Sequence, residues 1–207
     1  MSLSGFVSES KQRISKVREG ISNIIGEDEE VLIEEKSRLE DRINKLPISS
    51  SEWTTFSNLL DKEKHETAEK KVKNKFGWSQ TVINEAAVIY ANMTYYQSGI
   101  NVSEAESEIY NSAQSMRSLE EQLNKENPEK ENIAEKFNSA HKSLKKALSE
   151  IKRSEKETDR SRTATNYFEI SGDLSENLNK QEKRIDKLRK EIKDINKHIS
   201  EKRKQLT

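Results

Sequence analysis

The stretch Leu174–Leu206, LSENLNKQEKRIDKLRKEIKDINKHISEKRKQL, decides the fold of this chain. Its apolar residues recur at alternating steps of four and three, which is the heptad pattern of a coiled-coil helix. Nothing in this alternation requires a kink, so we predict one continuous helix. Gln181 and Lys202 occupy two seam positions, where polar residues set the register of packed helices. The other seam positions are all leucine or isoleucine: Leu174, Leu178, Ile185, Leu188, Ile192, Ile195, Ile199 and Leu206.

The composition of the whole chain favours helices that pack lengthwise against one another. Of its 207 residues, 36% are charged and only 31% are hydrophobic. A typical globular domain is about a quarter charged and nearly half apolar. So few apolar residues can form narrow stripes along helices, but they cannot fill one thick core. With two prolines and six glycines there is also little turn punctuation for a many-stranded fold. We therefore predict an all-α protein.

The beginning of the chain carries a second long helical pattern, which we predict from Val7 to Leu46, with Pro47 ending it. Two apolar stripes meet beside Gly26, where we expect a slip or kink, with a true break as the alternative. Glu27–Asp41 contains eight acidic and two basic residues, whereas Leu174–Leu206 contains eleven basic and six acidic ones. We hypothesise that these first and last helices pack antiparallel as a stalk. The rival hypothesis is that the last helix pairs with itself across a dimer.

Shorter helices are predicted between these ends. Ser49 to Glu52 matches a capping box, so a helix should begin at about Ser50 and end at Gly77. The most apolar helix follows over 78–97, and Ser98-Gly99 should close it.

A second capping-box match at Ser103 predicts the start of another helix. The short turn at Asn127-Pro128 then predicts an antiparallel hairpin with the long helix that follows it.

The predicted fold is an elongated all-α bundle, with long antiparallel coiled-coil helices at the two termini and a central head of shorter helices. We divide the chain at the expected helix ends. Residues 1–48 form the N-terminal long helix, and 49–127 form the central head. Residues 128–172 form the long helix of the hairpin, and 173–207 form the C-terminal coiled-coil helix.

The sequence carries no recognisable catalytic, cofactor or metal motif. Its three histidines, His65, His141 and His198, are far apart in the sequence, and none belongs to a Glu-x-x-His pair. Cysteine is absent, and no glycine-rich phosphate loop is present. We therefore expect a protein that is not an enzyme and that carries no cofactor or metal.

Aromatic residues concentrate between positions 53 and 96. At helical spacing such residues are more often core than binding site. If an exposed patch binds a partner, we expect it here, because large apolar side chains form binding hot spots. The candidate partner-binding residues are Trp53, Phe56, Phe76, Trp78 and Tyr95.

These features predict a scaffold or adaptor that mediates protein–protein interaction, with a protein partner or a second copy bound through coiled-coil helices. Lysine-rich stretches at 62–75 and 142–156 leave an alternative, a peripheral membrane-surface helical dimer that resembles BAR domains in length and helix content only. A net charge of zero argues against a nucleic-acid partner. No apolar run reaches the roughly 20 residues of a membrane span, and no signal peptide is visible, so we expect a soluble, cytoplasmic protein.

Overall fold

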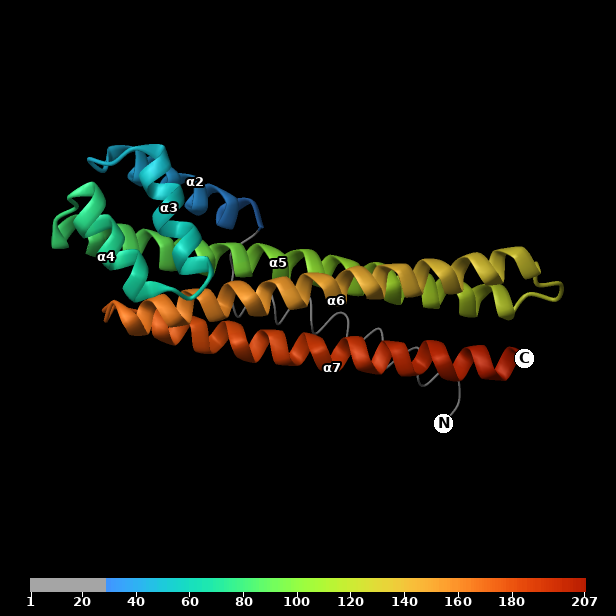
Figure 1. Ribbon diagram of the computed structural model, residues 1–207. Coiled ribbons are helices and arrows are strands. Elements are labelled where there is room, and N and C mark those ends of the chain that lie inside the picture. The colour runs from blue at the N-terminus through green and yellow to red at the C-terminus, as the bar shows by residue number, and fades with distance from the viewer. Residues whose placement is uncertain (1–28) are drawn as a thin grey trace. The chain divides into compact units, whose positions relative to one another are not determined.

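The computed structural model describes residues 29–207, which form six α-helices and no β-strand (Figure 1). The predicted all-α helical bundle is thereby confirmed. Residues 7–28 of the predicted first helix, with the expected slip at Gly26, lie outside the described residues. The helices are α2 Glu29–Lys45, α3 Ser50–Asp61, α4 His65–Phe76, α5 Gln80–Leu123, α6 Lys130–Tyr167 and α7 Leu174–Leu206.

The described residues divide into two compact units, and the divisions fall inside the three long helices. We call residues 29–102 and 151–186 the aromatic unit, because it holds the cluster of aromatic side chains. Residues 103–150 and 187–207 form the three-helix unit, which takes one segment from each of α5, α6 and α7. Our sequence-based division followed expected helix ends, whereas these units share their helices.

The capping box at the start of α3 is present as predicted. The Ser49 hydroxyl accepts from the backbone of Glu52, and the Glu52 carboxylate accepts from the backbone of Ser49. The single helix that we expected up to Gly77 is wrong, because α3 ends at Asp61 and α4 begins at His65. Glu63 lies between them in the left-handed region, with a φ of 58°, and so turns the chain. Gly77 does end α4, with a φ of 68°.

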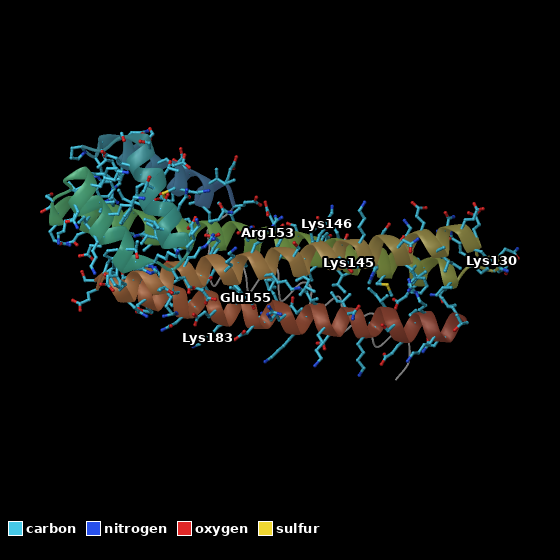
Figure 2. All side chains as sticks on the ribbon, viewed as in Figure 1. Lys130, Lys145, Lys146, Arg153, Glu155 and Lys183 are labelled. Carbon is cyan, nitrogen blue, oxygen red and sulfur yellow. The ribbon has the colours of Figure 1, made fainter. Side chains whose placement is uncertain are left out.

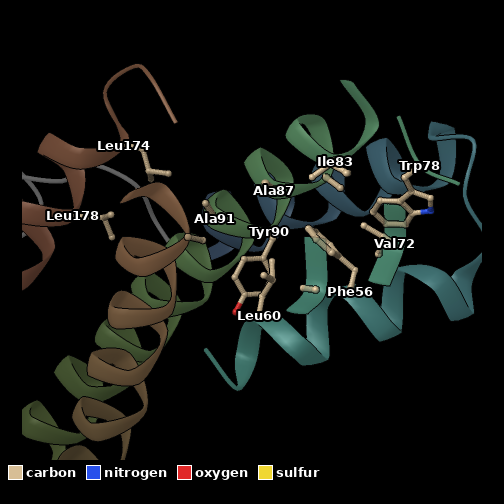
Figure 3. Close-up of a cluster of buried hydrophobic side chains, with 13 residues drawn as sticks. Phe56, Leu60, Val72, Trp78, Ile83, Ala87, Tyr90, Ala91, Leu174 and Leu178 are labelled. Carbon is tan, nitrogen blue, oxygen red and sulfur yellow. The ribbon is translucent and has the colours of Figure 1, made fainter. Parts of the chain in front are cut away.

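The core of the aromatic unit forms where α3, α4 and α5 meet (Figure 3). Phe56 is fully buried, and its ring centroid lies 5.2 Å from that of Trp78 and 6.2 Å from that of Phe168. The turn at Glu63 allows both short helices to contribute, because Leu60 of α3 and Val72 of α4 are buried in the same cluster. The complete buried set is Phe56, Leu60, Ala68, Val72, Trp78, Ile83, Ala86, Ala87, Tyr90, Ala91, Ala164, Leu174 and Leu178.

Helix α5 is continuous from Gln80 to Leu123, so the predicted helix end at Ser98-Gly99 and the predicted new start at Ser103 are wrong. Both small residues serve helix packing instead of a turn. A Cβ atom on Gly99 would lie 3.1 Å from Cδ1 of Leu32 in α2, so the missing side chain allows α2 to approach α5 closely. Ser98 is fully buried inside the unit.

Ser98 is the centre of a buried hydrogen-bonded layer in the aromatic unit, which we call the Ser98 layer. Its hydroxyl lies 2.8 Å from that of Ser154 and 2.6 Å from that of Thr158, both in α6. The side-chain amide of Gln181 in α7 donates to the same hydroxyl at 3.3 Å. One layer therefore joins three helices through polar groups, whose pairing avoids the cost of burying them unsatisfied.

A second contact, seven residues earlier on α5, has the same character. The Ser161 hydroxyl of α6 donates to the backbone carbonyl of Ala91 at 2.7 Å. From Ala91 to Ser98 the chain advances seven residues along α5, and their partners on α6, Ser161 and Ser154, go back by seven. The two helices are therefore antiparallel. Small residues at each of these positions let the two backbones approach closely.

Helix α2 packs against α5. Leu39 and Ile43 of α2 form a buried cluster with Ile89 of α5. Arg42 forms an ion pair with Glu85 of α5 at 2.9 Å, and this pair is part of the same helix contact. We had hypothesised that this acidic segment pairs with the last helix. Within the described residues, its buried leucine and isoleucine instead contact the apolar stripe of α5 that contains Ile89.

The three-helix unit contains the antiparallel hairpin that we predicted around Asn127-Pro128. The Ser112 hydroxyl of α5 donates to the backbone carbonyl of Ala140 in α6 at 2.7 Å, and both residues are fully buried. Leu188 and Ile199 of α7 are buried in the same unit. The buried carboxylate of Glu120 lies 3.2 Å from Nε2 of His198, so one polar contact joins α5 and α7.

Candidate protein-docking groove

A groove of about 250 Å³ lies in the three-helix unit, between the beginning of α6 and the end of α7. Figure 2 labels Lys130, the first residue of α6 and a member of its wall. We call this feature the α6–α7 groove. Its lining residues are Lys130, Ile133, Ala134, Phe137, Asn138, Arg203, Leu206 and Thr207.

The floor of the groove is apolar because the stripes of two helices meet there. Ile133 and Phe137 are four residues apart and so lie on one face of α6. Phe137 is only 6% exposed, whereas Leu206 in the last turn of α7 is 46% exposed. Leu206 is a seam position of the predicted coiled coil, so the seam continues into the groove with an uncovered leucine.

The charged side chains that line the groove are both cationic. Lys130 stands on the α6 side, and Arg203 stands on the α7 side. The Arg203 guanidinium carbon lies 5.5 Å from the centroid of the Phe137 ring, which is a cation–π distance. Lys204 is also in the last turn of α7. An apolar floor with a cationic rim suits an amphipathic segment that carries carboxylates beside its apolar side chains.

The coiled-coil seam of α7 lies mostly inside the protein. Leu174, Leu178 and Ile185 are buried in the aromatic unit, and Leu188, Ile192 and Ile199 are buried in the three-helix unit. The two polar seam positions are also buried, with Gln181 2% exposed and Lys202 7% exposed. Ile195 is half-buried and Leu206 is exposed.

The aromatic residues that we proposed for partner binding lie in or against the core of the aromatic unit. Phe56 and Trp78 are buried, so they are not available to a partner, and this part of the expectation is corrected. The Trp78 indole N–H donates to Glu52 at 3.3 Å, which satisfies its one polar atom. Trp53, Phe76 and Tyr95 are partly buried and pack against the same cluster. Part of their hydrophobic area is therefore used in folding.

A polar network at the edge of the aromatic unit joins three helices. The Tyr90 hydroxyl donates to Asp61 at 2.8 Å, and Nε of Arg160 lies 3.7 Å from the same carboxylate. Arg160 also donates to Glu157 at 2.6 Å. Burial raises the pKa of the Tyr90 phenol, and the hydrogen bond to Asp61 raises it further. Burial likewise raises the pKa of Glu157. These groups are paired with one another and tie α3 and α5 to α6.

His65, the first residue of α4, is 5% exposed, and its Nε2 atom has no hydrogen-bond partner. Its ring lies 5.4 Å from that of Tyr167 and 6.2 Å from that of Phe168. Burial lowers the pKa of this imidazole, although a hydrogen bond to the backbone of Glu63 and the Glu63 charge oppose the shift. Glu66 and Glu69 are the acidic groups beside Tyr167. Burial therefore favours the neutral form of His65.

We expect His65 to make the protein less stable in acid. Because its pKa in the folded state lies below the ordinary 6.5, the unfolded chain binds the proton more readily. The contribution of neutral His65 to the stability of the fold is therefore complete above pH 6.5. It is lost as the pH falls toward the pKa of His65 in the folded protein. Urea unfolding at pH 7.5 and 5.5 should show a smaller loss on acidification for His65→Phe than for the wild type. The exposed His141→Gln is the control, and equal losses for wild type and His65→Phe would contradict the assignment.

Comparisons of the chain with protein-family models, curated proteins and solved structures found no match in any of the three. Within residues 29–207, no helix combines the length and apolarity needed to cross a membrane. In the same residues, no cluster of three or more histidine or acidic side chains is placed to hold a metal ion.

Proposed function

We propose that the chain is a non-enzymatic helical scaffold or adaptor, which mediates protein–protein interaction by holding an amphipathic helix in the α6–α7 groove. The observation that carries this proposal is the combination of an apolar floor at Phe137 and Leu206 with a cationic rim at Lys130 and Arg203. Helix-in-groove binding uses apolar anchor residues for affinity, and charges at the rim select the partner. The cytoplasmic location expected from the sequence is part of this proposal.

The packing of the long helices supports a scaffold function. Most seam residues of α7 are buried against other helices of the same chain. In the aromatic unit, Ser98 and Gln181 fix the helices with buried hydrogen bonds. In the three-helix unit, Ser112 does the same. A rigid set of helices can present a surface groove at low entropic cost, because its walls are ordered before the partner arrives.

The alternative function, binding to an anionic membrane surface through lysine-rich faces, is less well supported. On α4, Lys70 lies 2.5 Å from Glu66, and Lys73 lies 3.9 Å from Glu69. Lys71 and Lys75 are exposed on the same helix. Two of these four lysines are paired with a carboxylate. The surface of α4 is therefore less positive than its lysines alone would make it.

Binding of designed helical peptides to the full chain tests the proposed function. Two labelled peptides of equal length would share one leucine stripe and differ only in an acidic or a basic rim. Fluorescence anisotropy at low salt should show at least tenfold tighter binding of the acidic peptide. Arg203→Glu should weaken that binding at least tenfold, whereas Lys193→Glu, an exposed lysine of α7 outside the groove, should leave it unchanged. Equal binding of both peptides, or no effect of Arg203→Glu, would contradict the proposal.

A further inference from the structure

The first two turns of α2, in the aromatic unit, carry an exposed apolar pair. Val31 is 40% exposed and Ile33 is 51% exposed, which makes them two of the five large hydrophobic side chains exposed among residues 29–207. They flank Leu32, which is 4% exposed and anchors the helix to its own unit. When the aromatic unit folds, Leu32 is buried, and the side chains of Val31 and Ile33 on either side of it stay exposed. We call Glu29–Glu35 the α2 plug.

The rim of the α2 plug is acidic. Its seven residues include four carboxylates, from Glu29, Glu30, Glu34 and Glu35, and no basic residue. Arg38 pairs with Glu34 at 2.8 Å and with Glu35 at 2.6 Å, and these pairs are solvent-exposed. Exposed pairs of this kind are weak and readily exchanged. Glu29 and Glu30 in the first turn of α2 therefore give the plug its negative character.

The α2 plug and the α6–α7 groove are complementary in chemistry. The groove offers Phe137 and the exposed Leu206 below two cations, Lys130 and Arg203. The plug offers the exposed side chain of Ile33, which shares one face of α2 with Glu29 and Glu30, four and three residues earlier. Contact between them would cover two of the five exposed large hydrophobic side chains of the described residues, namely Ile33 and Leu206. It would also place opposite charges on the two rims.

We propose that the α2 plug of one copy of this chain docks in the α6–α7 groove of a second copy. The inference rests on the proposed function, because it takes the groove to be a helix-binding site and names its occupant. Plug and groove are different surfaces, so the contact is heterologous, and a bound pair still has one plug and one groove free. Further copies can therefore bind to the free plug and the free groove of a pair. Because both surfaces are small and charged, we expect it to be weak and sensitive to salt.

Sedimentation velocity of the full chain tests this proposal. At 50 mM NaCl the average mass should rise with protein concentration above that of a monomer, and at 500 mM NaCl it should return to that of a monomer. The plug-deficient variant combines Glu30→Lys with Ile33→Asp, and the groove-deficient variant combines Arg203→Glu with Leu206→Asp. Each variant alone should remain monomeric at low salt. Circular dichroism would establish that both retain their helix content, and Lys193→Glu should associate like the wild type.

A mixture of the two variants gives the sharpest result. The plug-deficient chain keeps its groove and the groove-deficient chain keeps its plug, so the mixture should form a one-to-one complex and nothing larger. A mixture that stays monomeric while the wild type associates would overturn the plug–groove contact. A wild-type chain that is monomeric at every concentration would overturn it as well. In that second case, tight binding of the acidic peptide would still support the groove as a helix-binding site, so the two proposals can fail separately.

Discussion

Replacing Phe56 with alanine is expected to lower the free energy of unfolding by about 3–5 kcal/mol, the usual cost of deleting a fully buried aromatic ring. Phe56 is 0% exposed, and it contacts aromatic rings from two other segments of the chain, at Trp78 and Phe168. The short helices α3 and α4 cannot close over the space, because Leu60 and Val72 are already fully buried in the same cluster. The loss therefore includes both hydrophobic transfer and an unfilled cavity.

Urea unfolding, followed by tryptophan fluorescence, measures this effect. Both tryptophans of the chain, Trp53 and Trp78, lie beside Phe56 and report on the aromatic unit. Tyr110→Ala is the control, because Tyr110 is 39% exposed, and its replacement should cost less than about 1 kcal/mol. A loss as small for Phe56→Ala would mean that the ring is not part of the core. It would also return Phe56 to the list of candidate partner-binding residues.

Ser98→Leu is expected to cost about 2–5 kcal/mol. The larger side chain has no room in the Ser98 layer, and overpacking of this kind costs about 1–3 kcal/mol. The substitution also removes the acceptor of the Gln181 amide and the hydroxyl partner of Thr158. Each buried polar group left unpaired costs about 1–3 kcal/mol. The two contributions act at one point, so we do not expect them to add fully.

Ser98→Ala separates the two causes. Alanine fits the space and loses the hydroxyl, whereas the Ser154 hydroxyl can still donate to the backbone carbonyl of residue 98, a bond of 3.0 Å in the wild type. Thermal and urea unfolding of both variants should therefore show a clearly smaller loss for alanine than for leucine. Equal losses would mean that hydrogen bonding alone, and not space, limits this position.

The helical class and the last helix could be predicted because their signal is local. The alternation from Leu174 to Leu206 repeats for almost five heptads, and no distant residue is needed to interpret it. The capping box at Ser49 and the end of α4 at Gly77 were also predicted, since each depends on a few neighbouring residues. Helix starts and stops of this kind follow from backbone groups that need a partner close in sequence.

Ser98-Gly99 misled the prediction because small and polar residues have two uses. They favour turns when the chain must reverse, and they also allow close packing when two helices meet. The two uses can be distinguished only by contacts with residues that are remote in sequence. Ser98 contacts Ser154 in α6, and Gly99 lies against Leu32 in α2. At Glu63 the prediction made the opposite error and missed a turn. Glutamate rarely adopts a positive φ, so the sequence did not indicate the turn between α3 and α4.

The candidate groove left only one sign in the sequence. Lys130 is one of many lysines, and its proximity to Arg203 depends on the register of α6 against α7. The one available sign was Leu206, the last seam position, which continues the stripe after the helices that could cover it have ended. The aromatic residues were expected to be core more often than binding site, and Phe56 and Trp78 are buried in the core. Their spacing indicates an apolar face, but it does not show whether α5 or a partner covers that face.

The close pairing of α5 and α6 in the aromatic unit has a consequence for how these helices could move. Ala91 and Ser98 face Ser161 and Ser154, and all four residues are small. If α6 slid by seven residues along α5, Ser98 would face Ala147 or Ser161, which are again small residues. The bonds that Thr158 and Gln181 make to Ser98 hold the observed alignment at this point. These polar atoms thus help to fix the alignment of two long helices, and a motion of α6 along α5 would have to break their hydrogen bonds.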